Sequence, residues 1–449
     1  MPDKQGFPYA EVQFTKSGDV HDPNEVSALL EMVAAPATTD LLVLTHGWNN
    51  TMDEARGLYD KLLGLLRRAL SEGQVPGIGS RSFAALGLLW PSKKFADKEL
   101  IASGAAGVRS AVGDDLLLDQ LQELKELIDE PEADAALERA AQLVPLLEDR
   151  RTARAEFADL LRSALSQSEA DDEDASTNLF ALPGDQVMDR LSRPIRPAAD
   201  GRPPRRGQAA GTGGPSGQAA GLRRFFAGGP KGAALKLLNY TTYYKMKERA
   251  GTVGRGGAYE VLSQVRARRA DMGLHLVGHS FGARLVTVAT AGLEGRPPLR
   301  PDSLTLLQAA FSHYSFAQDW EGARDGAFRA VMSNHLVSGP VLITYTHNDI
   351  AVGLAYPLAS LLLNQVASGL GDKNDRFGGL GRNGAQRTPE AGDGSLLEVG
   401  GTYQFAPDTI YNLNADEVIG DHGDIAKGEV VYALLTAIAG TRQARTDDG

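Results

Sequence analysis

Two parts of the chain alternate between continuous apolar runs and helical periodicity. In the first part, apolar runs at 41–45 and 83–90 flank a stretch at 52–70 whose leucines recur at helical spacing. Continuous apolar runs are typical of parallel strands that are buried on both faces. With an edge strand at 9–16 and a short helix at 25–35 before it, this part predicts strand, helix and strand of an α/β sheet.

The second part resumes the alternation after a long interruption. Apolar runs at 274–277, 303–307 and 340–346 predict further buried strands, and a last strand is predicted near 409–413. Helical patterns cover 231–249, 257–270, 281–293, 325–335, 350–365 and 428–440. Residues 366–400, which include nine glycines, predict a long loop. Together the two parts predict the α/β class, with a doubly wound, mostly parallel sheet.

The interruption at 93–234 lacks this alternation. Its first half is helical in pattern, with apolar stripes at 117–128 and 157–164 that Pro145 separates. Residues 166–230 are polar and rich in glycine and proline, which predicts that most of the segment, chiefly 195–222, is a disordered linker because little apolar surface is available to offset the ordering entropy. A short patch at 179–191 is expected to dock locally. We therefore predict an N-terminal core part at 1–92, a helical insertion or lid at 93–234 that contains the linker, and a C-terminal core part at 235–449.

The strand at 274–277 runs into the sequence Gly278-His279-Ser280-Phe281-Gly282, and a helical pattern follows. This is a complete G-x-S-x-G sequence in the strand-to-helix context of a nucleophile elbow. Gly278 and Gly282 leave room for a sharp turn, which lifts the Ser280 hydroxyl above the sheet edge at the positive end of the helix. Ser280 is therefore the candidate nucleophile. The alternative is a tight turn whose serine only caps the helix.

A serine hydroxyl needs a base to take its proton and a third group to orient that base. Of the eight histidines, His275 and His279 lie in the strand and turn of the nucleophile, where they do not readily face its hydroxyl. His422 lies in a loop after the last strand, and such loops open at the carboxyl edge of a doubly wound sheet. Asp349 follows the strand at 340–346 and completes the chain order Ser, Asp, His. We predict His422 as the base and Asp349 as the acid, with Asp416 and Asp424 as reserve acids and His347 as a rival base.

Two backbone N–H groups are expected to stabilise a developing oxyanion. One belongs to Phe281, directly after the nucleophile. The other belongs to Trp48, because the strand at 41–45 ends in His46-Gly47-Trp48 and a glycine there lets the main chain approach a substrate. His46, Gly47, Gly278 and Gly282 are the predicted supporting residues. The alternatives are an ordinary βα turn with a buried tryptophan and, for Asp349, a helix N-terminal cap.

With these residues in place, the chain resembles the α/β-hydrolase superfamily. More narrowly, it resembles bacterial hydrolases with an H-G-[FYW]-N-N run after the oxyanion strand and a W-P-S run after the next strand. These runs are His46-Gly47-Trp48-Asn49-Asn50 and Trp90-Pro91-Ser92 here. The resemblance covers 38–92 and 235–440. It implies hydrolysis of acyl esters or related bonds through Ser280, Asp349 and His422, without a cofactor.

Composition narrows the remaining function classes. The 449 residues carry a net charge of −11, which argues against nucleic acid as the main partner. The absence of cysteine excludes disulfides, a cysteine nucleophile and thiolate metal sites, and no histidine spacing argues for zinc. No apolar run has the length of a membrane span, and the N-terminus lacks the features of a secretory signal. The expected location is the cytoplasm, with export by a signal-independent route as the alternative.

The expected substrates are small-molecule or lipid carboxylic esters. A secreted antibacterial lipase effector would share the same site. The alternative to an enzyme is a non-catalytic scaffold that uses the fold to bind a partner. A block at 193–224 contains seven arginines and no glutamate. It suits contact with phosphates or with an anionic membrane surface, and the alternative is a solvated arm.

Overall fold

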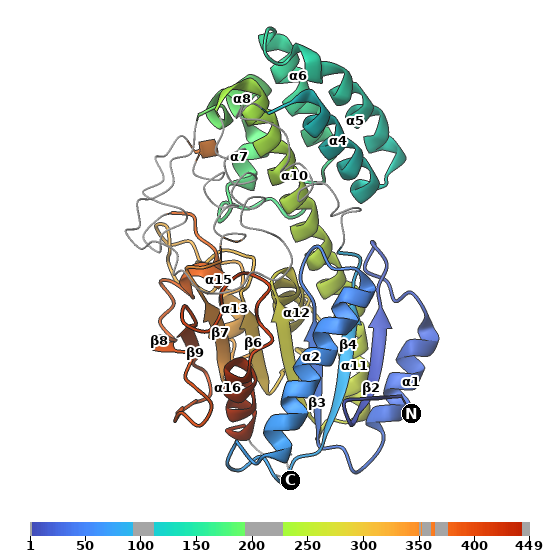
Figure 1. Ribbon diagram of the computed structural model, residues 1–449, viewed down its shortest axis with the longest axis vertical. Helices are drawn as coiled ribbons and strands as arrows, with labels where there is room; N and C mark the ends of the chain where they lie inside the picture. The colour runs from blue at the N-terminus through green and yellow to red at the C-terminus, as the bar shows by residue number, and fades with distance from the viewer. Residues whose placement is uncertain are drawn as a thin grey trace. The chain divides into compact units, whose positions relative to one another are not determined.

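The computed structural model of the chain describes residues 2–92, 112–193, 228–349, 352, 361–363 and 376–441. It divides into two compact units (Figure 1). The unit that we call the core unit comprises 1–92, 246–353 and 378–449, and the insertion unit comprises 93–245 and 354–377. One division falls after residue 92 and another within helix α10 (Gly229–Val253).

The core unit is built on a sheet of nine strands among the described residues. In sheet order these are β1 (Asp3–Lys4), β2 (Phe7–Gln13), β4 (Phe83–Leu89), β3 (Asp40–Thr45), β5 (Gly273–His279), β6 (Ser303–Leu307), β7 (Val341–Tyr345), β9 (Ile410–Asn414) and β8 (Ala391–Ser395). The β1–β2 pair is antiparallel, and the pairs from β2 to β8 are parallel. The structure confirms the predicted α/β class and the mostly parallel sheet.

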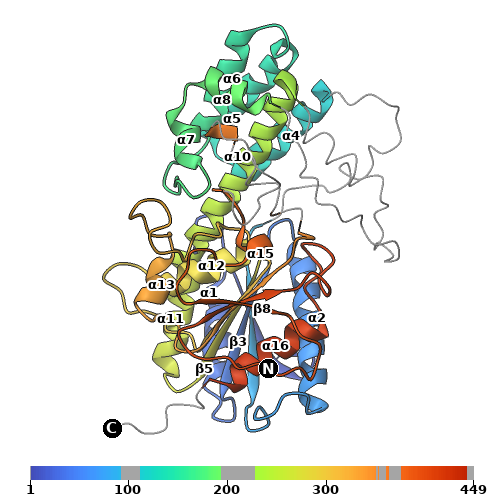
Figure 2. The ribbon, with the colours of Figure 1, turned by 90° about the vertical axis from the view of Figure 1, so that its left-hand side faces the viewer.

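Helices cover both faces of this sheet, as Figure 2 shows. The core-unit helices are α1 (Pro23–Val33), α2 (Met52–Ser71), α11 (Tyr259–Arg268), α12 (Phe281–Ala291), α13 (Arg329–Ser333), α15 (Leu380–Asn383) and α16 (Gly428–Ala439), with a π-helical turn η3 (Gly254–Ala258) between α10 and α11. The pair α2 and α16 packs on one face, while α1, α11 and α12 lie on the other. Because both faces are covered, every residue of β3 and β4 is buried, which explains their continuous apolar sequences.

The direction of winding reverses between β3 and β5. The strand β3 pairs with β4 on one side and with β5 on the other, and the sheet continues from β5 to β6. Connections that leave two such neighbours diverge, and the crevice at their carboxyl ends is the usual ligand position in open α/β sheets. Thr45 of β3 lies opposite Gly278 of β5, so the segments that follow these residues begin side by side.

The insertion unit is helical. Its helices are α4 (Asp114–Ile128), α5 (Pro131–Leu143), the 3₁₀ turn η2 (Val144–Leu146), α6 (Arg151–Ser163), α7 (Ser176–Ala181), α8 (Gly184–Leu191) and the first part of α10. Pro145 lies in η2 and separates α5 from α6, as predicted. The apolar positions predicted to face a core, such as Leu121 and Phe157, are buried.

The expected linker at 166–230 is wrong in its first part, because the residues up to 193 include α7 and α8. Leu179 and Leu191 are fully buried, and Nζ of Lys236 donates to the Leu191 carbonyl at 2.9 Å. Tertiary contacts therefore order a segment whose composition is polar, and the patch expected to dock does so. Residues 194–227 of the expected linker lie outside the described residues.

The long loop expected at 366–400 is also wrong in part, since it contains α15 and β8. The strand β8 has the sequence Ala-Gly-Asp-Gly-Ser, is largely exposed, and pairs with β9. Its strand structure comes from main-chain pairing with a neighbour, and nothing in its side-chain pattern indicates a strand. The helix expected at 350–365 lies mostly outside the described residues.

Candidate active site

Ser280 occupies a strained turn between β5 and α12. Its backbone angles, φ 56° and ψ −121°, are rare for a residue with a side chain. The surrounding main chain holds this conformation, because Ser280 N–H donates to the Leu307 carbonyl at 3.0 Å and Ala310 N–H donates to the Ser280 carbonyl at 3.2 Å. Strain that the structure sustains in this way is common at functional sites.

The two glycines of the elbow are required by packing. A Cβ atom on Gly278 would lie 2.5 Å from Cα of Ala283, and one on Gly282 would lie 2.6 Å from the Thr45 carbonyl oxygen. Real Cβ atoms do not approach other atoms so closely. The start of α12 therefore lies directly against the ends of β5 and β3, as the motif predicts.

Three residues from separate parts of the chain form a hydrogen-bonded series with Ser280 at one end. Nε2 of His422 lies 2.8 Å from Oγ of Ser280, and Nδ1 of His422 lies 2.7 Å from Oδ2 of Asp349. A carboxylate only accepts hydrogen bonds, so we assign the proton of neutral His422 to Nδ1, which leaves Nε2 to accept from the serine hydroxyl. The series has the donor and acceptor order that a serine nucleophile needs.

The members of the series differ in their exposure. Asp349 is fully buried, while the His422 side chain is 24% exposed. The second carboxylate oxygen of Asp349 accepts from Val352 N–H at 2.9 Å. One carboxylate oxygen of Asp349 therefore contacts His422, and the other contacts the main chain that follows Asp349.

The reserve candidates are occupied elsewhere. Asp416 accepts from the N–H of His347 at 2.7 Å and lies 2.9 Å from Nδ1 of the same residue. Burial alone would raise the pKa of Asp416, but the hydrogen bonds from His347 and Thr346 outweigh it and lower this pKa. Asp424 forms an ion pair with Lys427 at 2.8 Å. The structure brings Ser280, His422 and Asp349 together and does not place these three alternatives in the same series.

The loop after β3 lies against the elbow. A Cβ atom on Gly47 would be 2.7 Å from Cβ of Ser280, so only glycine fits at this position. The Trp48 ring meets the Phe281 ring edge-on, with 6.2 Å between ring centroids. Phe281 is the first residue of α12 and directly follows Ser280. The two residues predicted to supply N–H donors thus lie next to each other, beside the serine.

His46 supports this loop through contacts with Trp90 and is not part of the series of Ser280, His422 and Asp349. It is fully buried and its ring stacks on Trp90, with 5.7 Å between centroids. Nε2 of His46 accepts from Trp90 N–H at 3.2 Å, and Nε1 of Trp90 donates to the His46 carbonyl at 2.9 Å. Asn49 N–H donates to the Ser92 carbonyl at 3.0 Å. The H-G-W-N-N and W-P-S runs therefore bind each other, and burial, which lowers the pKa of His46 to about 4, keeps it neutral.

His279 is the residue near the site that the sequence reasoning set aside. Its Nε2 donates to the main-chain carbonyl of His422 at 2.8 Å. A polar side chain at the end of a buried strand is a signal for such a contact, but the partner is set by the tertiary structure. Among the described residues, no cluster of three or more histidine, aspartate or glutamate side chains is arranged to hold a metal ion.

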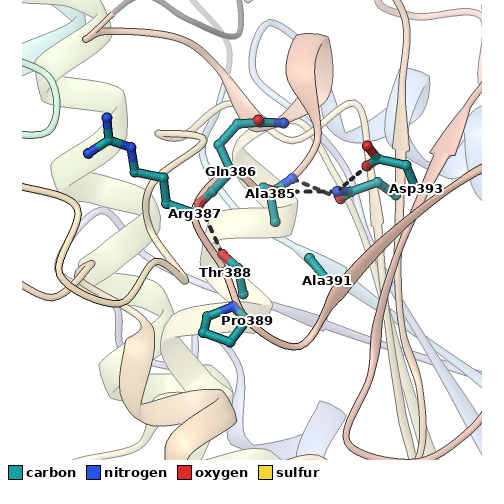
Figure 3. A pocket seen from close by; sticks show the side chains of 8 residues that line it. Ala385, Gln386, Arg387, Thr388, Pro389, Ala391 and Asp393 are labelled. Atoms are coloured by element: carbon teal, nitrogen blue, oxygen red, sulfur yellow. Dashed lines mark hydrogen bonds between the residues drawn. The ribbon is translucent and has the colours of Figure 1, made fainter.

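A hollow of about 340 Å³ lies beside β8 and β9 (Figure 3). The buried Asn412 amide on its wall donates to the Ala385 carbonyl at 3.1 Å and to Asp393 at 3.0 Å, and it accepts from Ala385 N–H at 2.8 Å. The polar atoms of the Asn412 side chain therefore form hydrogen bonds within the protein. Ser280 and its two partners do not line this hollow, so the candidate chemistry lies elsewhere.

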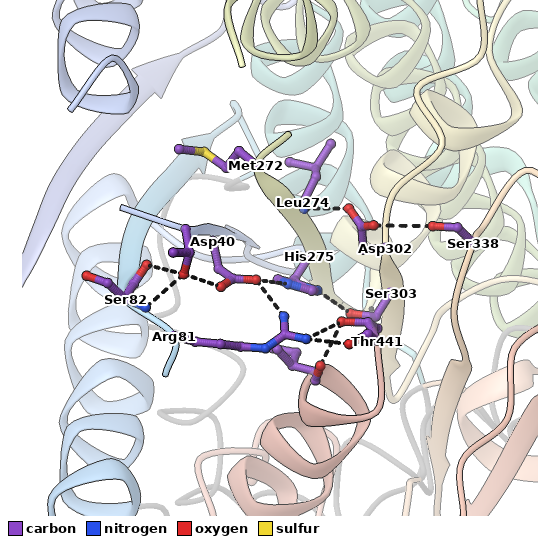
Figure 4. Close-up of polar contacts among 12 residues, drawn as sticks. Asp40, Arg81, Ser82, Met272, Leu274, His275, Asp302, Ser303, Ser338 and Thr441 are labelled. Atoms are coloured by element: carbon purple, nitrogen blue, oxygen red, sulfur yellow. Dashed lines mark hydrogen bonds and ion pairs between the residues drawn. The ribbon is translucent and has the colours of Figure 1, made fainter. Parts of the chain in front are cut away.

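A second series of the same residue types lies near the beginning of β5 (Figure 4). Nδ1 of His275 lies 2.9 Å from Oγ of Ser303, and Nε2 of His275 lies 2.9 Å from Oδ1 of Asp40. Arg81 donates to the same Asp40 oxygen at 2.7 Å and to the Thr441 carbonyl at 2.5 Å. This network joins β3, β5, β6 and Thr441, the second residue after α16.

Comparison of the chain with protein families, curated proteins and solved structures finds no match. None of the described helices is both long and apolar enough to cross a membrane. The functional assignment therefore rests on the residues and geometry of the site.

Proposed function

We propose that the protein is a serine hydrolase of the α/β-hydrolase fold that cleaves carboxylic esters, lipid esters included. The observation that carries the proposal is the series from Ser280 through His422 to Asp349, which begins at a strained turn. The reversal of winding between β3 and β5 supports it, because it places the serine where open α/β sheets bind ligands.

In the proposed first step, Oγ of Ser280 attacks the ester carbonyl while Nε2 of His422 takes the hydroxyl proton. Asp349 holds the His422 ring and stabilises the imidazolium that forms. The N–H groups of Phe281 and Trp48 donate to the oxyanion. The tetrahedral intermediate collapses when His422 returns the proton to the leaving alkoxide, which yields an alcohol and an acyl-serine.

Water completes the proposed cycle. The oxygen of a water molecule attacks the acyl-serine while His422 takes a proton from that water. A second oxyanion then forms at the N–H groups of Phe281 and Trp48. Collapse breaks the bond to Oγ, and His422 protonates the released serine. The products are a carboxylic acid and the free enzyme. The proposal assigns no step to a metal or a cofactor, because Ser280, His422 and water supply the nucleophiles and the proton transfers.

The proposal is tested with a fluorophosphonate probe, which labels activated serines. Labelling of the wild type is expected to be lost in Ser280→Ala and retained in Ser303→Ala. Ser303 is the matched serine, because it belongs to the second series, with His275 and Asp40. Peptide mapping should place the label on Ser280. A panel of p-nitrophenyl esters and phospholipids then defines the substrate. A wild type that is neither labelled nor active on the panel would favour the non-catalytic scaffold.

A further inference from the structure

The ring of His279 lies between the serine turn and the loop that carries the base. Its Nε2 lies 2.8 Å from the carbonyl oxygen of His422, so Nε2 must carry a proton that it donates. The two imidazole rings lie 4.9 Å apart, at an angle of 40°. The side chain of His279 therefore holds the main chain of the same residue whose side chain contacts Ser280.

The other edge of the His279 ring faces the loop after β3. A Cβ atom on Gly47 would lie 2.8 Å from Nδ1 of His279. This Nδ1 is buried and has no hydrogen-bond partner among the described residues. The His279 ring therefore contacts both the loop after β3, which carries the expected oxyanion donor, and the loop that carries His422. His279 itself is the last residue of β5.

The loop of the base is anchored at both ends, because Ile419 and Ile425 are fully buried and the Ile419 carbonyl accepts from the Asn348 amide at 2.9 Å. Gly423 N–H donates to Oδ1 of Asp421 at 2.9 Å, and Gly420 N–H donates to Oδ2 of Asp424 at 3.1 Å. These bonds shape the loop but do not fix its distance from Ser280. The bond from His279 joins the loop to β5, the strand that also positions the serine.

We propose that His279 is a positioning residue that sets the placement of His422 relative to Ser280. The inference rests on the proposed hydrolase function. Burial, followed by the neighbouring His422, lowers the pKa of His279 to about 3, so that the ring stays neutral near neutral pH and carries its single N–H proton on Nε2. His279 lies between the turn of Ser280, the loop after β3 and the loop of His422, so its ring can act as a rigid spacer between them.

The experiment compares His279→Leu, which removes the donor, with His279→Gln, whose terminal amide can donate from a similar distance. His275→Gln, on the same strand but away from His422, controls for loss of a buried histidine. We measure kcat and KM with a p-nitrophenyl ester, after counting active molecules by fluorophosphonate titration and checking folding by circular dichroism. Because misplacing a reacting group by about 1 Å costs roughly 100-fold, His279→Leu is expected to lower kcat by about 10–100-fold with KM within about twofold.

The glutamine variant should recover kcat to within about fivefold of the wild type, and His275→Gln should stay within about twofold. The proposal is overturned if His279→Leu keeps wild-type kcat, or if the glutamine variant is as slow as the leucine variant. A loss that appears only in KM would also overturn it, since it would indicate a substrate contact.

A second measurement keeps this inference separate from the proposed function. The proton between Nδ1 of His422 and Asp349, in a 2.7 Å bond, should give a downfield proton resonance in the wild type whether or not the protein hydrolyses esters. Its loss in His279→Leu, with retention in His279→Gln and His275→Gln, supports the positioning role. Retention in His279→Leu overturns it. Failure of the fluorophosphonate to label Ser280 in the wild type would instead count against the hydrolase proposal alone.

Discussion

The core unit contains two hydrogen-bonded series of serine, histidine and aspartate, near opposite ends of β5. In the carboxyl-end series, His422 lies 2.8 Å from Ser280 and 2.7 Å from Asp349. In the amino-end series, His275 lies 2.9 Å from both Ser303 and Asp40. Residue types and distances alone therefore do not separate a candidate catalytic site from a structural network.

The surroundings of the two series separate them. His275 and Ser303 are completely buried, whereas the His422 side chain is 24% exposed. Ser303 lies in a regular strand, whereas Ser280 lies in a strained turn. Burial alone would raise the pKa of Asp40, but its contacts with His275, Thr39 and Arg81 lower it. The amino-end carboxylate is thus shared between His275 and an ion pair with Arg81, whereas the carboxyl-end carboxylate contacts His422 and a main-chain N–H.

The largest expected difference between the series is in catalysis. Asp349→Asn should lower kcat by about 10⁴-fold, because an amide can stabilise the wrong tautomer of the base and carries no charge to balance an imidazolium. Asp40→Asn is the matched change in the buried series, and its kcat per folded molecule should stay close to that of the wild type. Steady-state kinetics on a p-nitrophenyl ester measures kcat of both variants. Comparable losses of kcat would show that the two series do not differ in catalysis.

The next effect is on stability and belongs to the buried series. Arg81→Met should lower the free energy of unfolding by about 3–5 kcal/mol, because it leaves the buried Asp40 carboxylate without its cation. The double variant with Asp40→Asn should cost less than the sum of the two single changes. Urea unfolding of the four proteins provides the measurement. Additive losses would show that the pair contributes no coupling.

The sequence predicted much of the core unit because its buried strands have uninterrupted apolar patterns. It pointed to Ser280, Asp349 and His422 through motif context and chain order, and the structure brings these residues together. The strand β8 was missed because it is exposed and pairs through its main chain. The patch at 179–191 was expected to dock, but the helices α7 and α8 were not predicted, because contacts such as the bond from Lys236 to Leu191 join residues far apart in the sequence.

The same limit explains why His279 was set aside. Sequence spacing shows that this residue adjoins the nucleophile, but it does not show that the His422 loop returns to within 2.8 Å of its ring. Likewise, the amino-end series joins residues more than 200 positions apart, between His275 and Asp40. Contacts of this kind follow from the register of β3, β5 and β6, which a single sequence does not specify.

A smaller catalytic effect is expected from a single methyl group. Gly47→Ala would place a Cβ atom 2.7 Å from Cβ of Ser280 and 2.8 Å from Nδ1 of His279. The resulting shift should lower kcat by about 100-fold. Gly57→Ala is the matched control, since it lies in α2 with nothing within 4 Å of the new atom, and it should raise stability by about 0.5–1 kcal/mol. Unchanged kcat in Gly47→Ala would show that the loop relaxes away from the serine.

The smallest effect is the dependence of stability on pH through His279. Burial lowers the pKa of this residue from 6.5 to about 3, so between these values the unfolded chain binds a proton that the folded chain does not. Stability therefore falls as the pH decreases below 6.5. From pH 6.5 to 5.5 this one residue should reduce the free energy of unfolding by about 1 kcal/mol.

Urea unfolding of the wild type and of His279→Gln at both pH values tests this prediction. The loss of unfolding free energy between pH 6.5 and 5.5 should be about 1 kcal/mol smaller in the variant. An equal loss in both proteins would mean that His279 is protonated in the folded state. In that state Nδ1 would be a second donor facing Gly47, and the neutral spacer between the two loops would be excluded.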